Sequence, residues 1–221
     1  MCSLEMSGLG RSDGGTFNEV RLEGIQRFSG AVKCVDFRSE GIFRAEDVEC
    51  QQRLTIEGIG TMRSLQANII DVEGVCQVKE RLVCQLLKLE GYLRVGQTLK
   101  TKTAQLVGKF KFKETVEAEI VDLVFVEHSS FDVISATTVK IKRDLEGSYG
   151  RKQPSFFANL KQRLMIGHLI EGEEVEIDYC KVKQVYGDRI KIGPYCQIDE
   201  IEYKESLEIH PTAVVKSAKQ L

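Results

Sequence analysis

The sequence predicts an all-β protein, a parallel β-helix in which one short coil repeats along the chain. The first observation is a Glu-Gly pair that recurs at a nearly constant spacing in the first half of the 221 residues. The glutamates are at positions 23, 40, 57, 73 and 90, and Val107-Gly108 continues the series, so the numbering rises by 17, 17, 16, 17 and 17 from one corner to the next. A fixed period indicates one structural unit stacked on itself. This unit is too short for a pair of helices, whereas it suits one coil of a β-helix.

The second observation is that apolar residues keep fixed places within each repeat. When each Glu is counted as position 1, positions 3 and 6 are apolar, and alternating apolar residues also precede the next corner. Position 3 holds Ile25, Ile42, Ile59, Val75 and Tyr92, and position 6 holds Phe28, Ala45, Met62, Val78, Val95 and Phe112. Within a coil these residues alternate as in a strand with one buried face. Three short strands joined at corners would make each coil a triangle.

The third observation is the length of the repeat. Seventeen residues at ~3.3 Å each give a perimeter of about 56 Å and triangle edges under about 19 Å. Such a triangle is filled by its own side chains and leaves no ligand cavity. The Gly after each Glu fits a corner where the backbone has a positive φ or passes close to the next coil. The stacked glutamates form a carboxylate row, which we interpret as a solvated corner and not as a metal site.

The repeat pattern divides the chain into five segments. Residues 1–18 are rich in Gly and Ser and are predicted to be a disordered tail. Residues 19–145 contain the repeats and form the β-helix domain. Residues 146–170 form a basic linker, residues 171–205 a smaller β-rich C-terminal module, and residues 206–221 a second tail.

The two segments after the repeats have opposite charge. From Gly147 to Ile170 there is no acidic residue, and Pro154 can open a short helix with apolar residues on one side. This helix either docks on the β-helix or lies on a membrane surface, in which case Phe156, Phe157, Lys161 and Arg163 contact lipid. The following segment is acidic, and Cys180 and Cys196 indicate a further repeat of similar length in it.

Composition limits the partners and the compartment. The formal net charge of −2 gives no whole-chain attraction to nucleic acid. The seven Cys include no CxxC pair, so they are expected to be small buried thiols in a reducing compartment. Residues 1–15 lack the pattern of a signal peptide, and no apolar run reaches the ~18 residues needed to span a bilayer. The expected location is therefore the cytoplasm.

Enzyme and nucleotide motifs are not found in the sequence. There is no GxxxxGK[ST] loop and no GxGxxG after a strand, so neither a nucleotide nor another cofactor is expected. His128, His168 and His210 lie outside the regular repeats, and the period of 16–17 does not keep the six-residue sub-repeat of β-helix acyltransferases. The segment Lys109–Lys113 alternates Lys with Phe, which we interpret as one exposed and one buried face and not as a nucleic-acid site.

The repeat block from Phe17 to Arg143, with its Glu-Gly corners and its Val/Ile/Leu/Cys/Ala columns, resembles the bactofilins, the bacterial polymer-forming cytoskeletal family. The resemblance covers somewhat over half of the chain and implies a single right-handed β-helix. It also implies non-polar filaments that form without nucleotide, and a scaffold for cell-wall or motility proteins at the membrane. The C-terminal extension departs from the short members of that family.

The sequence therefore predicts a structural scaffold with no catalytic, cofactor or metal site. It would assemble with itself or with a paralogue, recruit cell-envelope or motility proteins, and contact the inner face of the cytoplasmic membrane. The predicted polymerisation interface consists of Leu22, Ile25 and Phe28 at one end and Phe125, Phe131 and Val133 at the other. The alternative is a non-polymerising binding module whose C-terminal β segment recruits a protein partner. A β-helix acyltransferase ranks third.

Overall fold

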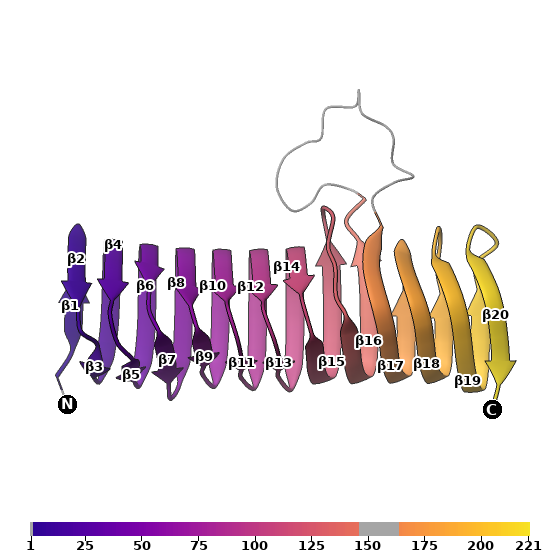
Figure 1. The fold of residues 1–221 in the computed structure, drawn as a ribbon, viewed down its shortest axis with the longest axis horizontal. Helices are drawn as coiled ribbons and strands as arrows, with labels where there is room; N and C mark the ends of the chain where they lie inside the picture. The colour runs from indigo at the N-terminus through magenta and orange to yellow at the C-terminus, as the bar shows by residue number, and fades with distance from the viewer. Residues whose placement is uncertain (1, 146–163) are drawn as a thin grey trace, which may run out of the picture. The chain divides into compact units, whose positions relative to one another are not determined.

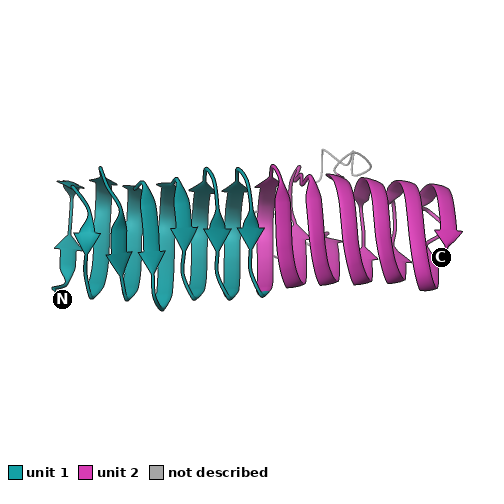
Figure 2. Ribbon diagram, turned by 60° about the horizontal axis from the view of Figure 1, so that its bottom comes forward, with its two compact units in different colours: residues 1–102 teal, residues 103–221 magenta. Residues whose placement is uncertain are grey.

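A computed structural model describes residues 2–145 and 164–221 and confirms the predicted fold class. All twenty described secondary-structure elements are strands, and every strand pairing is parallel within the two compact units, residues 1–102 and residues 103–221. Each unit is a β-solenoid in which successive coils lie side by side (Figures 1 and 2). Glu23 pairs with Glu40, and Glu40 pairs with Glu57, so each coil returns to the same corner after one period of the repeat.

In unit 1 each complete coil consists of a long strand and a short one. The long strand turns at its Glu-Gly corner and so contributes two faces, and the short strand contributes the third. The strands are β1 (Leu4–Met6), β2 (Leu9–Ser12), β3 (Gly15–Thr16), β4 (Glu19–Phe28), β5 (Val32–Cys34), β6 (Asp36–Arg44), β7 (Asp47–Cys50), β8 (Arg53–Met62), β9 (Ser64–Gln66), β10 (Ile69–Val78), β11 (Leu82–Val83), β12 (Leu86–Val95) and β13 (Leu99–Lys100).

In unit 2, β14 still has ten residues and the corner at Gly108, but the later strands become longer. The strands β17 to β19 each contain 13 residues. The coil length also varies here, because Met165 pairs with Cys180, whereas Arg189 pairs with Ser206 beyond a register shift. The strands are β14 (Thr103–Phe112), β15 (Thr115–Phe125), β16 (Val133–Arg143), β17 (Met165–Ile177), β18 (Cys180–Ile192), β19 (Gln197–Ile209) and β20 (Val214–Gln220).

The Gly of each corner has the conformation that the repeat predicts. Gly41, Gly58 and Gly74 have φ values of 128°, 125° and 130°, which L-residues rarely adopt. A Cβ built on Gly58 would lie 2.2 Å from the carbonyl oxygen of Gly41 in the preceding coil. The corner therefore requires Gly for two independent reasons, its backbone conformation and the close approach of the next coil.

The position after this Gly faces outward, which corrects the interpretation of position 3 as a buried column. The exposed fractions of Ile25, Ile42 and Ile59 are 50%, 37% and 38%, whereas Phe43, the residue after Ile42, is fully buried. Glu, Gly and Ile together form the corner and all three face away from the core. In the two-residue alternation the corner Gly stands at a place that would otherwise point inward, and position 4 is inside again.

The predicted N-terminal tail is wrong, because residues 4–16 form one more coil. Leu4 and Met6 of β1 stack on Val20 and Leu22 of β4, β2 stacks on the second half of β4, and β3 stacks on β5. The repeat thus begins earlier than its Glu-Gly signal does. Gly8 has a φ of 70° and stands one repeat before Gly24, so it continues the same corner column.

The predicted C-terminal divisions are also wrong. The strand β16 pairs with β17, β17 with β18 and β18 with β19, so residues 171–205 continue the stack and are no separate module. Residues 165–170, assigned to the linker, belong to β17, and residues 206–221, assigned to a tail, contain the end of β19 and all of β20. Phe156, Phe157, Lys161 and Arg163, the predicted lipid contacts, lie outside the described residues, as does the helix expected from Pro154.

Candidate interaction surfaces

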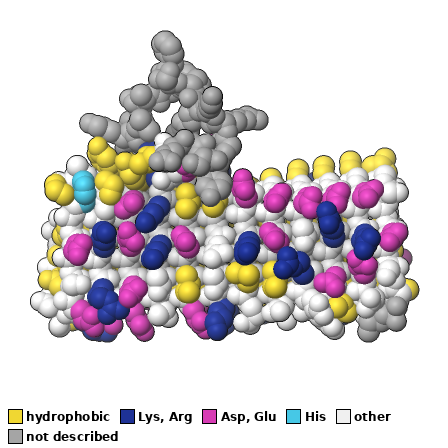
Figure 3. Space-filling model, turned by 180° about the vertical axis from the view of Figure 1, so that it is seen from behind, with side chains coloured by type: hydrophobic (Ala, Val, Ile, Leu, Met, Phe, Trp, Pro, Cys, Tyr) yellow, Lys and Arg dark blue, Asp and Glu magenta, His cyan; other side chains and the backbone are white. Residues whose placement is uncertain are grey.

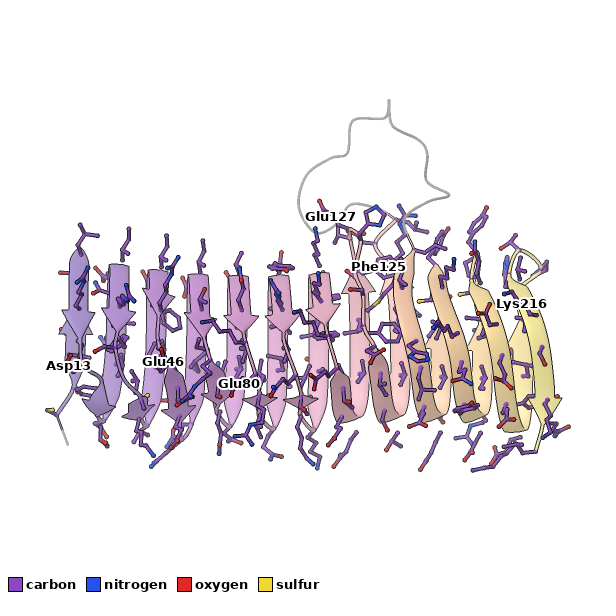
Figure 4. All side chains as sticks on the ribbon, viewed as in Figure 1. Asp13, Glu46, Glu80, Phe125, Glu127 and Lys216 are labelled. Atoms are coloured by element: carbon purple, nitrogen blue, oxygen red, sulfur yellow. The ribbon has the colours of Figure 1, made fainter. Side chains whose placement is uncertain are left out.

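The residues predicted to form the polymerisation interface lie inside the stack. Leu22 and Phe28 are buried under β1 and β2, and Phe125 lies on β15 between β14 and β16 (Figure 4). Val133 pairs with Thr115 on one side and with Leu169 on the other. Their expected place in the end coils is therefore wrong, because further coils lie beyond both ends of the repeat block, outside the regular spacing of its Glu-Gly pairs.

Two of these residues have distinct surroundings. Phe131 is buried beside Gly167, where an added Cβ would lie 1.9 Å from the aromatic ring, so the absent side chain at Gly167 makes room for Phe131. Ile25 is half exposed, because it follows the corner Gly. The structure thus brings Leu22, Ile25 and Phe28 together on β4, but it does not place them at a free edge.

The first coil leaves part of the core of unit 1 uncovered. Val20 and Leu22 are at most 2% exposed, whereas Leu4 and Met6, their equivalents one coil earlier, are only half-buried. Among the described residues, β1 and β2 pair with β4 alone, so their other edges carry no strand. This end therefore presents backbone hydrogen-bonding groups together with apolar side chains.

The last coil leaves the core of unit 2 uncovered in the same way. Ile190 and Ile192 are at most 2% exposed, but their partners on β19 are less covered: Leu207 is half-buried, and Ile209 is 44% exposed. The strand β20 pairs with β19 alone among the described residues, so its second edge also carries no strand. Both surfaces are end coils, and sequence analysis missed them because it treated both segments as tails.

Two of the three histidines, His168 and His210, have side-chain partners that the sequence did not predict. Nδ1 of His168 lies 3.3 Å from Oδ1 of Asp132, and both side chains are about half exposed. Nδ1 of His210 lies 2.9 Å from the hydroxyl oxygen of Thr212, and His128 is exposed. His168 and Asp132 come from neighbouring coils and are far apart in the sequence, so only the fold brings them together. No group of three or more metal-ligating side chains lies together in the part of the chain that the structure describes.

Six of the seven cysteines are buried, as expected for small core thiols, and Cys2 is exposed. Burial raises the pKa of Cys76 to about 12 and that of Cys196 to about 12. Cys50 donates to the backbone carbonyls of Val35 and Arg53, each at 3.1 Å. A raised pKa keeps the thiol protonated, so Cys76 and Cys196 act as apolar core residues and are poor nucleophiles.

The segment Lys109–Lys113 has the alternation that was expected. Phe110 and Phe112 are buried and their rings stack at 6.1 Å, while the three lysines are exposed. Within residues 2–145 and 164–221, no helix is long and apolar enough to cross a membrane.

Unit 2 also has a shallow groove of about 550 Å³ across its coils. Small residues of neighbouring coils, Ala118, Ala136 and Gly172, line it together with carboxylates such as Glu171 and Glu202. The charged residues of its lining are Glu171, Glu173, Asp188, Glu202 and Lys204, so the groove is mainly acidic.

Comparison with known proteins gives one short similarity. The chain is 36% identical over 62 residues to the uncharacterized protein YhbE of Bacillus subtilis (strain 168). The aligned stretch is 28% of this chain and 26% of that protein, so the chain spans about a quarter of the length of the curated relative it matches. No family model matches the chain, and no solved structure matches it.

Proposed function

We propose that this protein is a structural scaffold that assembles with itself through its end coils, without nucleotide. The observation that carries the proposal is the uncovered core at both end coils. Leu4 and Met6 continue two buried columns of unit 1, and Leu207 and Ile209 continue two in unit 2. No further coil covers any of them among the described residues.

The physical argument is that an uncovered coil is a template for another coil. The free edge of a strand has N–H and C=O groups that can pair with a second chain, and repeat proteins normally cover such ends with a polar cap. Here the end residues are apolar and the strand edges are open. Joining two end coils would bury these side chains and satisfy the edge groups in one contact.

The wider role follows from the resemblance to bactofilins. On that basis the assembled scaffold recruits cell-envelope or motility proteins at the cytoplasmic face of the membrane, and a paralogue can join the assembly. The polymer is the platform, so the chain needs no catalytic site of its own.

Sedimentation with a matched pair of variants tests this proposal. The purified chain is pelleted at high speed with and without ATP or GTP, and the pellet is viewed by negative-stain electron microscopy. Ile209 at the end coil and Ile120 within the stack are both 44% exposed. Ile209→Lys is expected to keep the protein in the supernatant, whereas Ile120→Lys is expected to pellet like the unmodified chain. Equal pelleting of both variants, or a wild-type chain that stays monomeric, would overturn the proposal.

A binding module remains the second candidate, favoured by the groove of unit 2. In that case a basic protein segment binds between the small residues and the carboxylates, and assembly plays no part. Glu171→Lys with Glu202→Lys would then abolish capture of a basic peptide, measured by fluorescence anisotropy, while Ile209→Lys would leave capture unchanged.

A further inference from the structure

An exposed apolar ridge runs along one corner of unit 1. The ridge consists of the residue that follows the corner Gly in six successive coils, and the strand registers place these residues directly one above the next. Its members are Leu9, Ile25, Ile42 and Ile59, which are exposed, and Val75 and Tyr92, which are half-buried. Leu9 is 83% exposed, and Figure 3 shows yellow side chains in a line along the upper edge of this unit.

The ridge is more than scattered surface hydrophobicity. Single exposed apolar residues are normal on a protein surface, but an uninterrupted row is a mark of an interaction site. Six residues at the inter-strand spacing of ~4.8 Å form a continuous line about 24 Å long. The core does not need these side chains, because the residue that follows each of Ile42, Val75 and Tyr92 is fully buried and fills the interior instead.

Rows of opposite charge flank the ridge on its two sides. Two residues before each ridge residue stands an acid in five of the six coils: Glu23, Glu40, Glu57, Glu73 and Glu90. Two residues after it stands a base in four coils: Arg11, Arg27, Arg44 and Arg94. The corner separates the two rows, so the acidic row lies on one face of the solenoid and the basic row on the next.

The basic row has no partner within the described residues. None of its four arginines forms an ion pair there, although Arg38, on the opposite side of the ridge, contacts both Glu40 at 2.8 Å and Glu57 at 3.1 Å. Glu23, Glu73 and Glu90 likewise form no ion pair with a described residue. Both flanks therefore retain charged groups that can pair with a second molecule.

We infer that the ridge binds the ridge of a second copy of this chain, with the two copies side by side and parallel. The charges decide the orientation. A two-fold axis parallel to the solenoid axis places the acidic row of each copy opposite the basic row of the other, whereas a perpendicular axis places like charges together. In the parallel arrangement the three glutamates Glu23, Glu40 and Glu90 face Arg27, Arg44 and Arg94 of the second copy, respectively.

The same charges argue against a lipid surface as the occupant. An anionic membrane would attract the basic row but repel the five carboxylates that stand as close to the ridge. A second copy satisfies both rows at once. The ridge contact is separate from the end-coil contact, so it adds lateral association to the proposed end-to-end assembly and does not depend on it.

Cross-linking tests the contact and its direction. The full chain carries Cys2→Ser, to remove the exposed thiol, and Ile209→Lys, to prevent end joining. With Tyr92→Cys added, a short bis-maleimide is expected to link two copies through residue 92, because equivalent coils face each other. An antiparallel contact would instead link Tyr92→Cys to Leu9→Cys. Ile120→Cys, on unit 2, is the control and is expected to stay unlinked.

Charge reversal gives a second, independent readout by sedimentation equilibrium at low salt. Glu90→Arg alone and Arg94→Glu alone should each weaken pairing at least about tenfold, because like charges then face each other. An equimolar mixture of the two variants should pair as tightly as the unmodified chain, since both cross-contacts are restored. Failure of the mixture to recover, or a link between residues 92 and 9, would overturn the inference.

These outcomes are distinguishable from failure of the proposed function. Ile42→Ser with Ile59→Ser should narrow any assembly seen by electron microscopy without shortening it, whereas Ile209→Lys should shorten it. The double variant Ile42→Ser with Ile59→Ser could instead pair normally but no longer float with phosphatidylglycerol vesicles, unlike the unmodified chain. The ridge would then bind lipid, and the inference of a second copy would be overturned.

Discussion

Replacement of Gly58 by Ala tests the corner that determines the whole stack. Gly58 has a φ of 125°, and an added Cβ would lie 2.2 Å from the carbonyl oxygen of Gly41, a backbone atom that cannot rotate away. A non-Gly residue in such a backbone conformation costs about 1–3 kcal/mol. Relief of the contact requires two coils to separate locally, which weakens their hydrogen bonds at about 1 kcal/mol each.

If about two such hydrogen bonds are lost, these contributions add to a loss of about 3–5 kcal/mol of unfolding free energy. The lower entropy of the unfolded chain with Ala returns about 0.4–1 kcal/mol of this. The net loss is a large share of the ~5–15 kcal/mol that stabilises a typical domain. Urea unfolding, followed by circular dichroism of the full chain, measures the change.

Gly8→Ala is the control that lacks the contact. Gly8 continues the same column, but nothing lies within 4 Å of its added Cβ, and its φ of 70° is in the left-handed region that L-residues can enter. The cost at Gly8 should be about 1 kcal/mol, which is the cost of that left-handed conformation. If Gly58→Ala costs no more than Gly8→Ala, the close approach of neighbouring coils does not constrain the corner, and the reasoning is refuted.

Three further outcomes are expected from the described packing. Phe43→Ala should lower the unfolding free energy, measured in urea, by about 3–5 kcal/mol, because Phe43 is fully buried. Ile42→Ala should lower it by under about 1 kcal/mol, because Ile42 is 37% exposed. Equal losses would contradict the outward direction of the ridge residues. Burial raises the pKa of Cys76 from its usual 9.0 to about 12, so the stability that the protonated thiol contributes is present below pH 9 and is lost as the pH rises toward 12. Between pH 8 and pH 10.5 the unfolding free energy of the unmodified chain should therefore fall by about 2 kcal/mol more than that of Cys76→Ala. Parallel pH profiles of the two proteins would contradict this. Deletion of residues 2–16 should lower the urea midpoint, because it uncovers Val20 and Leu22, whereas an unchanged midpoint would mean that these residues are a tail after all.

The period of the sequence was sufficient to predict the fold class, because one geometric requirement recurs at every corner. Gly41, Gly58 and Gly74 stand where the chain needs a positive φ and room for the next coil, and the strand registers then follow from the spacing. The outward direction of Ile42 and its equivalents was within reach of the sequence, because alternation counted back from the buried position 6 places position 4 inside and position 3 outside. The apolar residues at position 3 were instead counted as core on their composition alone.

The end coils were missed because composition and periodicity disagreed there. Residues 1–18 are rich in Gly and Ser, which is typical of disorder, yet Leu4, Met6 and Gly8 stand one repeat before Val20, Leu22 and Gly24. At the other end Glu171-Gly172 falls outside the regular spacing of the earlier pairs, so the long strands β17 and β18 show mainly the alternation of apolar residues. The predicted polymerisation interface therefore included interior residues such as Phe125. Uncovered apolar side chains beside open strand edges, the features expected of that interface, are found one or more coils further out.

The register of the Glu-Gly corners also determines how this chain can change in length over evolutionary time. Because Glu40, Glu57 and Glu73 occupy equivalent places, an in-frame duplication of one repeat would insert a complete coil and leave every column above and below it continuous. A duplication that does not contain a whole number of repeats would turn the next core column out to solvent. Growth is therefore restricted to whole steps of ~4.8 Å. A protein built in this way can serve as a molecular ruler, whose span is determined by the number of gene-encoded repeats.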